Sequence, residues 1–564
     1  SAVPILYDLL NRQPDVLAER VYAPWGDMAA LLRSRKIPLF SLESRRPLKD
    51  FHIIGFSLGY ELTYTNVLNM LDLAGIPLRA AERDDAHPLI IAGGSCCLNP
   101  EPMADFIDAF VIGDGEEVLL EFLDVFRSRQ GRGKDTLLRH LAAIPGVYVP
   151  RFYELSYQAD GRLGKITPAA DGVKSRVTRR TVAKLLPPVT NPVVPYLEAI
   201  HDRGTIEIQR GCTCGCRFCQ AGIVYRPLRE RSQEEVIKAA GEIISACGYD
   251  EISLLSLNTS DYPGIEQLVT SLARHYPDLA ISIPSLRLDT SAVNLMAALP
   301  ARSKTGLTFA PEAGSERLRQ VINKNISEDD ILSTINAALS RGWHSLKLYF
   351  MVGLPTETPE DIAGIAQLVG KIRSLGRGTS AKTPQIRISV ATFVPKPHTP
   401  FQWVGQDDES QLNLKQEMLK RDLPRKGVSL SWHDPKVSLL EAALSRGDRR
   451  LGGVIHEAWR RGAAFDAWTE CFNFEAWLSA FAAAGLEPGF YAQRGRALDE
   501  VLPWSHIDTG VSQAFLKAEY RRALKGQVTQ DCRYDACNAC GIQRRYPDCA
   551  QKLRGQGGGN PGQA

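Results

Sequence analysis

The stretch TIEIQRGCTCGCRFCQAG, residues 205–222, decides how the rest of the chain is interpreted. It begins as a β-rich run and continues into a loop where Cys212, Cys216 and Cys219 follow one another with C-x-x-x-C-x-x-C spacing. Three thiolates on a four-iron cube leave one iron without a protein ligand, much as a catalytic zinc keeps an open position. The stretch therefore predicts a 4Fe-4S cluster with one iron open to a substrate.

A zinc site is the alternative for the same loop, because Cys214 offers a possible fourth thiolate. Zinc sites normally draw their cysteines from two separated pairs, whereas these four cysteines form a single run. The iron cluster is therefore favoured, and the role of Cys214 stays open.

The region around this loop alternates between strand-like and helix-like runs, which is typical of a partial (β/α)6 barrel. Six strands are expected at 205–211, 251–260, 279–289, 305–315, 345–355 and 386–397. The chemistry of such a barrel lies at the carboxyl ends of its strands. The cysteine loop follows the first strand directly and is expected at that end.

The N-terminal part predicts a Rossmann-like parallel α/β sheet, with short β-rich runs at 37–42, 51–58, 88–94 and 109–115. Residues 61–75 are expected to form a crossover helix. Gly93, Gly94, Gly113 and Glu116 lie at the carboxyl ends of two of these strands, where open α/β sheets bind ligands. Tight turns alone also explain such glycines.

The C-terminal part is helical in pattern from about 410 to 525 and ends in a cysteine-rich tail. Cys532, Cys537, Cys540 and Cys549 have C-x4-C-x2-C-x8-C spacing, which suits either a closed zinc site or a second cluster. From 511 to 564 there are nine Lys or Arg and four Asp or Glu, a local charge of +5. This tail favours metal binding and allows contact with RNA, although a solvated basic tail explains the charge as well.

The amino-acid composition excludes few functional classes of protein. The 67 Lys plus Arg nearly balance the 64 Asp plus Glu, so net charge alone gives no argument for nucleic-acid binding. A basic run at 172–184 is an exception, for which a solvated face is the usual explanation and a contact with a polyanion the less common one. The sequence has no apolar run of roughly 20 residues and no secretory pattern at its start, so we expect a cytoplasmic protein without a membrane contact.

The cysteine loop resembles that of the radical S-adenosylmethionine (radical SAM) superfamily, in which an aromatic residue, here Phe218, precedes the last cysteine. The resemblance implies a 4Fe-4S cluster, S-adenosylmethionine bound to the open iron, and a flavodoxin or ferredoxin type reductant. It also implies S-adenosylmethionine contacts from Phe218 near the adenine, from Glu312 at the ribose with Ser315 nearby, and from backbone at Gly353. Ser285 and Arg287 end the third strand, where Arg287 is expected to reach the carboxylate.

The chain as a whole resembles an uncharacterised radical SAM branch with an N-terminal cobalamin-binding-type domain. The resemblance rests on phrases such as RVYAPWGDM at 20–28, GGSCCLNPEPMADFIDAFVIGDGEE at 93–117 and DCRYDACNACG at 531–541. It implies cobalamin near Gly93, Gly94, Gly113 and Glu116. Two departures stand out: no D-x-H-x-x-G run is present, and family members place a strand before the first helix expected here. The expected domains are 1–150 (cobalamin-binding type), 151–198 (linker), 199–408 (barrel), 409–525 (helical) and 526–564 (cysteine-rich tail).

These observations favour a radical SAM enzyme that cleaves S-adenosylmethionine to modify a substrate, with cobalamin-dependent methylation and an RNA substrate as open possibilities. Sulfur insertion from a second cluster is an alternative within the same class. A non-catalytic, metal-bearing RNA-binding or assembly factor is the alternative from another class.

Overall fold

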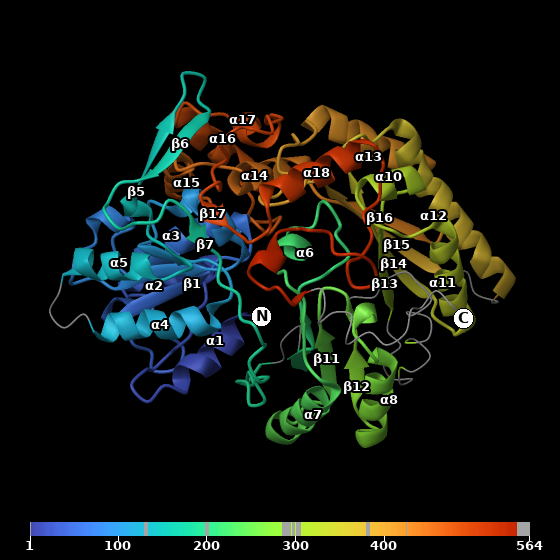
Figure 1. The fold of residues 1–564 in the computed structure, drawn as a ribbon, viewed down its shortest axis with the longest axis horizontal. Coiled ribbons are helices and arrows are strands. Elements are labelled where there is room, and N and C mark those ends of the chain that lie inside the picture. The colour runs from blue at the N-terminus through green and yellow to red at the C-terminus, as the bar shows by residue number, and fades with distance from the viewer. Residues whose placement is uncertain are drawn as a thin grey trace.

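The computed structural model describes residues 2–128, 133–197, 202–284, 295, 299, 306–379, 384–424 and 426–549. Its described part is a mixed α/β protein in which parallel sheets are covered by helices (Figure 1). None of the described helices combines the length and the apolar character that crossing a lipid bilayer requires.

The N-terminal sheet has the order β1-β2-β3-β4, with β1 (Ile53–Ser57), β2 (Leu89–Gly93) and β3 (Ala109–Val111) parallel and β4 (Val147–Tyr148) antiparallel. Helix α3 (Tyr64–Leu73) connects β1 to β2 as expected. The other helices of this part are α1 (Ala2–Asn11), α2 (Gly26–Arg35), α4 (Gly115–Arg127) and α5 (Lys134–Ala143).

The run at 37–42, expected to be a strand, is not one. Leu39 is buried, but its backbone N–H donates to the Leu73 carbonyl, and its own carbonyl accepts from Leu48. Only an isolated bridge between Phe40 and Pro47 forms in this run. The apolar residues therefore pack beneath the end of α3 without joining a ladder.

All six strands expected in the barrel are present, in two parallel sheets. One sheet has the order β12-β11-β8, with β8 (Gly204–Glu207), β11 (Glu251–Leu255) and β12 (Ala280–Ser282). The other has the order β13-β14-β15-β16, with β13 (Leu307–Glu312), β14 (Ser345–Val352), β15 (Gln385–Thr392) and β16 (Val428–Trp432). Strand β16 was not expected, because the sequence analysis assigned its residues to the helical region.

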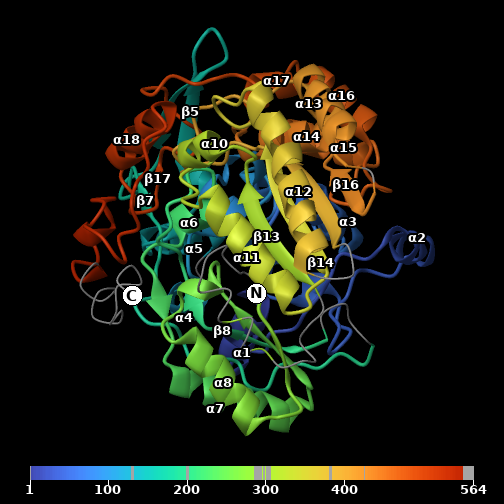
Figure 2. The ribbon, with the colours of Figure 1, turned by 90° about the vertical axis from the view of Figure 1, so that its right-hand side faces the viewer.

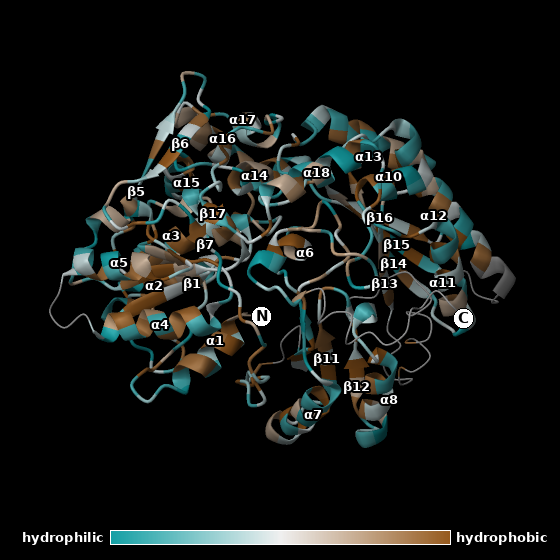
Figure 3. Cartoon of the chain, viewed as in Figure 1, coloured by the Kyte–Doolittle hydropathy of each residue, from teal (hydrophilic) through white to brown (hydrophobic). Residues whose placement is uncertain are grey.

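Alternation of buried residues explains why these strands form where they do. Leu346, Leu348, Phe350 and Val352 are all buried on one side of β14, against Ile331 of a covering helix among others. The covering helices are α7 (Gln233–Cys247), α8 (Ile265–His275), α10 (Glu316–Val321), α11 (Glu328–Ser340), α12 (Pro359–Thr379) and α13 (Glu409–Asp422). Figures 2 and 3 show α11 and α12 over this sheet, with hydrophobic colour concentrated on the strands.

Four C-terminal helices pack against the N-terminal domain: α14 (Pro435–Ser445), α15 (Leu451–Arg460), α16 (Phe474–Ala483) and α17 (Pro488–Ala492). The last helix, α18 (Gln513–Leu524), packs beside α6 and α10 instead. Val454, Ile455 and Trp477 share one hydrophobic core with Leu68 of α3. Burial of this shared surface holds the two ends of the chain together.

The region expected to be a linker contains ordered strands. Strands β5 (Tyr153–Tyr157) and β6 (Leu163–Pro168) form an antiparallel hairpin, and β7 (Val177–Thr178) pairs with β17 (Ile507–Asp508). The N-terminal domain, this connecting segment and the C-terminal region therefore meet at one place in the molecule.

Candidate functional site

The cysteine loop lies between two short pieces of regular structure at the carboxyl end of β8. Strand β9 (Gln209–Arg210) pairs antiparallel with β10 (Arg229–Glu230), and helix α6 (Gln220–Val224) follows the loop. Gly211 has a φ of +96°, and a Cβ there would lie 2.7 Å from the Tyr225 carbonyl oxygen. The turn before Cys212 therefore requires glycine.

Cys212, Cys216 and Cys219 are half-buried on this loop. Cys219 is the N-cap residue of α6, and its sulfur accepts a hydrogen bond from the Gly222 N–H at 3.4 Å. Burial raises the pKa of the Cys216 thiol to about 12, and burial also raises the pKa of Cys219. Thiols in such a place stay protonated until a cation or metal stabilises the thiolate.

Lys324 supplies a positive charge beside these thiols. Burial alone would lower the pKa of Lys324, but Cys216 and Glu312 raise it above its ordinary value. Its ammonium lies 3.7 Å from the Glu312 carboxylate. The structure therefore joins the cysteine loop with the carboxyl end of the fourth barrel strand.

Glu312 and Phe218 lie where the sequence analysis expects S-adenosylmethionine contacts. Glu312 ends β13 with a φ of +69°, and burial raises the pKa of its carboxyl against the opposing effect of Lys324. Phe218 packs in a cluster that includes Ala313 and Leu354, the neighbours of Glu312 and Gly353. The ends of two strands and the cysteine loop thus enclose one region.

Other expected contacts have structural partners. Ser315 caps α10 by accepting from the Leu318 N–H at 3.1 Å, and its hydroxyl donates to Asp361. The Gly353 N–H, at a φ of +83°, donates to Glu357 at 2.8 Å. Ser285 and Arg287 lie outside the described residues.

Cys214 acts on the pKa of Lys324 as Cys216 and Cys219 do, and it has hydrogen-bond partners of its own as well. The Asn258 side-chain amide donates to the Cys214 sulfur at 3.3 Å and to Asp261 at 2.5 Å. One ligand atom each from Cys214, Asp261 and Asp531 lies within 4.8 Å of the others, and among the described residues no other group of three cysteine, histidine or acidic side chains does so.

The C-terminal cysteines lie beside the cysteine loop. Cys540 and Cys549 pack against a cluster containing Ile223 of α6, Cys532 is half-buried, and Cys537 is exposed. Burial raises the pKa of Cys532 to about 11. The red C-terminal segment and α6 occupy the centre of Figure 1, between the N-terminal sheet and β13 to β16.

Arg226 links the two groups of cysteines. Burial would lower the pKa of its guanidinium, but Cys540 and Cys532 raise it above the ordinary value. Cys212 acts in the same direction. The Arg226 guanidinium therefore lies near thiols of the cysteine loop and near thiols of the C-terminal tail.

Hydrogen bonds fix the C-terminal segment onto the loop. Thr213 donates to Asp531 at 2.9 Å, and Asn323 bonds the Thr529 backbone in both directions at 3.1 and 2.7 Å. Arg217, with no exposed surface, pairs with Glu519 of α18 at 3.1 Å. The loop is therefore held by residues from far along the chain.

Of the four residues expected at a cobalamin site, three are closely approached by other parts of the chain: Gly94, Gly113 and Glu116. Gly94 is exposed, but a Cβ there would lie 2.4 Å from the Leu58 carbonyl oxygen, and at Gly113 a Cβ would lie 2.2 Å from the Arg180 carbonyl oxygen. Glu116 is buried and pairs with Arg210 of β9 at 2.7 Å. The turn at Gly93 stays exposed in part, whereas the connecting segment and the barrel cover the turn at Gly113.

Sequence reasoning missed Lys324 and Arg226. Lys324 follows the short helix after the fourth strand, in the polar run Asn323 to Asn325, and Arg226 comes shortly after the last cysteine of the loop. Position at a barrel strand end was a usable signal for Lys324. For Arg226, the C-terminal partners become apparent only from the fold.

Two family descriptions match the chain. "Radical SAM proteins, N-terminal" matches residues 2–150, and "Radical SAM superfamily" matches residues 206–369. The second match contains the cysteine loop and the ends of β13 and β14. The chain belongs to the radical SAM superfamily and carries an additional N-terminal domain. It is a radical SAM enzyme, and this family implies a 4Fe-4S cluster, S-adenosylmethionine and an external reductant.

Individual relatives differ in what their names state. The chain is 29% identical to an uncharacterized protein of Methanocaldococcus jannaschii over 74% of this chain and 83% of that protein. It is 23% identical to an uncharacterized methyltransferase of Pyrococcus horikoshii, covering 56% and 68% of the two chains. It is 27% identical to a threonylcarbamoyladenosine tRNA methylthiotransferase of Treponema pallidum, covering 31% and 38%. A solved cobalamin-dependent S-adenosylmethionine radical enzyme, OxsB, aligns over 97% of this chain and 81% of that chain, with a TM-score of 0.45 and 12% identity.

Proposed function

We propose that Cys212, Cys216 and Cys219 hold the 4Fe-4S cluster and that the chain cleaves S-adenosylmethionine reductively to begin modification of a substrate. The observation that carries the proposal is the convergence of the cysteine loop with Glu312 and Lys324 from the fourth strand. This brings the Cys216 and Cys219 thiols, one carboxylate and one ammonium together at the carboxyl ends of the barrel strands.

The residues present fit a cluster better than a zinc ion. Tetrahedral zinc with bonds of about 2.3 Å would bring its sulfur ligands to about 3.8 Å from one another. Among the described residues, no three cysteine sulfurs lie within 4.8 Å of one another. A cube binds each thiolate at a different iron atom and so holds the sulfurs further apart. Lys324 and Arg226 offset the negative charge that three thiolates bring.

The protein's own residues bind and orient the cofactor in this proposal. When bound, the cluster supplies the electron that breaks the sulfonium carbon–sulfur bond. Glu312 accepts hydrogen bonds from the ribose hydroxyls, and Phe218 packs near the adenine. Burial raises the pKa of Glu312, and Lys324 opposes this rise and so favours the ionised carboxylate. The packed cluster around Phe218 excludes water from this region.

For the reaction that follows cleavage of S-adenosylmethionine, we favour transfer of a carbon or sulfur group to an RNA substrate. The local charge of +5 at residues 511–564 supports RNA, and the tRNA methylthiotransferase among the relatives acts on such a substrate. The C-terminal cysteines are the proposed second metal centre, and with a sulfur-bearing cluster there, sulfur insertion is the second candidate reaction. Iron and sulfide analysis of a variant lacking these four cysteines, with the mass added to the substrate, separates insertion from methylation.

Cobalamin enters no step of the proposal. The Gly113 and Glu116 turn, where half of the expected cobalamin contacts lie, is filled by Arg180 and Arg210 and does not fit a cofactor. Cobalamin-dependent methylation thus stays a prediction of the sequence alone.

The test is anaerobic reconstitution with iron and sulfide, chemical reduction, and chromatography for 5′-deoxyadenosine. We expect product from the unaltered chain and none above background when Cys212, Cys216 and Cys219 are all changed to Ala. A Cys247→Ala, Cys471→Ala variant is the matched control, because both cysteines are remote from the loop, and it should keep full product. Equal product from the triple variant would refute the assignment, and RNA binding without any 5′-deoxyadenosine would favour a non-catalytic factor.

A further inference from the structure

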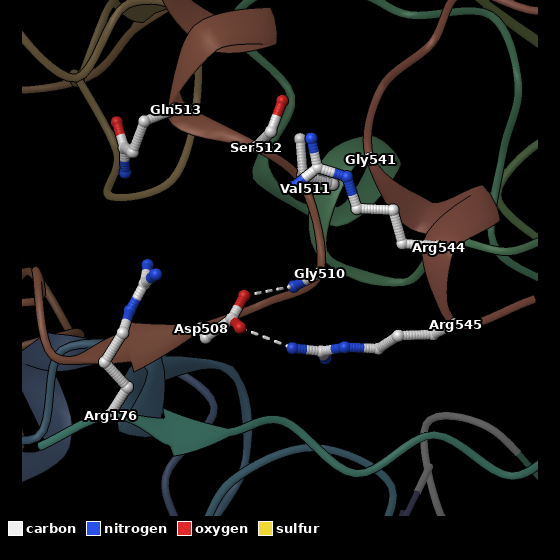
Figure 4. Close-up of a pocket in the computed structure, with 9 residues that line it drawn as sticks. All are labelled: Arg176, Asp508, Gly510, Val511, Ser512, Gln513, Gly541, Arg544 and Arg545. Carbon is white, nitrogen blue, oxygen red and sulfur yellow. Dashed lines mark hydrogen bonds and ion pairs between the residues drawn. The ribbon is translucent and has the colours of Figure 1, made fainter.

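A cavity of about 300 Å³ lies where the segment before β7 meets the C-terminal region. Arg176, Arg544 and Arg545 line it together with a single carboxylate, that of Asp508. Figure 4 shows Arg176 and Arg544 on opposite sides of this space, whereas Arg545 reaches Asp508. Two basic runs that lie far apart in sequence therefore line one cavity.

The cavity carries an excess of positive charge. Arg545 pairs with Asp508, while in the described part of the chain Arg176 and Arg544 have no carboxylate within 4.0 Å. Arg179, close behind in the same segment, is buried, and its Nη1 has no hydrogen-bond partner among the described residues. Burial lowers the pKa of Arg179 to about 10, and the nearby cations Arg229 and Arg545 add to this effect.

Guanidinium groups in this arrangement match a phosphate group. Their planar donors bind phosphate oxygens in pairs, and two unpaired guanidiniums on opposite sides can share one dianion or a phosphodiester. The cavity volume suits a phosphate with part of its sugar. Helix α18, whose first residue Gln513 also lines the cavity, carries the exposed cation Arg521, and the exposed Lys525 follows the helix directly.

The cavity is connected to the cysteine loop by short contacts. The Ser512 N–H donates to the Cys540 carbonyl at 2.8 Å, which joins the cavity lining to the C-terminal cysteines. Arg179 donates to the carbonyl of Arg226, the residue that faces Cys212. A ligand held here is therefore anchored beside the region that the proposed chemistry uses.

We propose that the cavity lined by Arg176 and Arg544 binds a backbone phosphate of an RNA substrate. This inference rests on the proposed function, because it names the part of the protein that anchors the substrate. It assigns a role to Arg176 in the basic run at 172–184, for which the sequence leaves a solvated face and a polyanion contact as alternatives.

The test measures binding of a fluorescein-labelled single-stranded RNA oligonucleotide to the full reconstituted chain by fluorescence anisotropy over a range of salt concentrations. Each phosphate contact contributes about 0.7 to the slope of log K against log salt for single strands. We expect the Arg176→Gln, Arg544→Gln variant, which loses one phosphate contact, to lose about 0.7 from this slope and to bind at least about tenfold more weakly at physiological salt. The charge-matched control is Arg35→Gln, Arg274→Gln, which removes two exposed arginines from α2 and α8.

An unchanged salt slope in the Arg176 and Arg544 variant, or an equal loss in the control, would overturn the inference. So would adenosine monophosphate binding as tightly as the RNA, because that outcome assigns the cavity to a free nucleotide. Formation of 5′-deoxyadenosine without substrate, measured in parallel, should be the same in all variants. Loss of that product from the unaltered chain would count against the proposed function instead.

Discussion

Buried and half-buried charged side chains at the barrel mouth define the site at the scale of single residues. Glu312, Lys324 and Arg226 come from three different segments, and each has a pKa moved by its neighbours. Burying a charge is costly unless it has partners, so these groups need either one another or a bound cofactor. The spacing of the three cysteines was enough to predict them as cluster ligands. Lys324 and Arg226 could not be predicted as site residues, because their contacts with the cysteines form only in the folded chain.

Changing Glu312 to Gln should weaken binding of S-adenosylmethionine without loss of the cluster. A hydrogen bond to a charged group is worth about 1.5–3 kcal/mol, so affinity should fall by about tenfold or more. Equilibrium dialysis with labelled S-adenosylmethionine and an iron assay on the same samples measure the two effects. Glu316→Gln, an exposed acid on α10, serves as control, and equal affinity in both variants would remove Glu312 from the binding site.

At the scale of elements, α18 holds the cysteine loop in place through one buried ion pair. Arg217 has no exposed surface, and besides Glu519 it donates to the backbone carbonyls of Gln320, Val321 and Gln527. These contacts join the loop, α10 and the end of α18 into one unit.

Changing Arg217 to Met should remove one of the two cations paired with the buried Glu519 carboxylate, which keeps Arg522 at 2.8 Å and the Thr529 hydroxyl. Breaking a buried pair completely costs about 3–5 kcal/mol, so with these remaining partners we expect a smaller loss of stability. We expect faster cleavage after α18 in limited proteolysis and a lower melting temperature. Arg521→Ala, on the exposed side of the same helix, should change stability by less than about 0.5 kcal/mol. Equal cleavage rates after α18 in the two variants would show that the Arg217–Glu519 ion pair does not hold this helix in place.

Strand prediction succeeded where buried apolar residues alternate along the strand or follow one another, and it failed where they do not. Alternating or continuous apolar runs identified the six expected barrel strands. Strand β16 was missed because it is an edge strand, with most of its side chains exposed or half-buried, including Trp432 at 37%. At 37–42 a strand was predicted where none forms, because the apolar residues of this run pack under a helix. The local sequence pattern predicts which side chains are buried, but it does not predict which backbone groups form hydrogen bonds with each other.

At the scale of the whole molecule, His398 joins the barrel to the N-terminal domain. Its Nε2 lies 2.9 Å from the Leu98 carbonyl oxygen, and the side chain is 2% exposed. Burial lowers the pKa of His398 to about 4, and burial lowers that of His506, also enclosed in this interior, to about 3. Both imidazoles are therefore neutral at physiological pH.

Stability should consequently fall on acidification. Below the ordinary histidine pKa of about 6.5 the unfolded chain takes up a proton that the folded chain refuses until about pH 4, so stability is complete above this window and decreases through it. For His398 the loss approaches about 3 kcal/mol, and His398→Gln should remove roughly half of the combined slope. Urea unfolding at about pH 5 and about pH 7.5 measures this, with exposed His275→Gln as control. An unaltered slope in His398→Gln would contradict the assignment.

The contact between Thr213 and Asp531 spans 318 residues of chain. During synthesis the ribosome therefore releases the cysteine loop long before the segment that secures it exists. A nascent chain at that stage has its thiols on an unfastened loop, and iron loaded then would meet water and oxygen. Completion of the C-terminal segment thus sets the earliest moment at which a protected reaction centre can be assembled, which makes late metal loading the natural order of maturation.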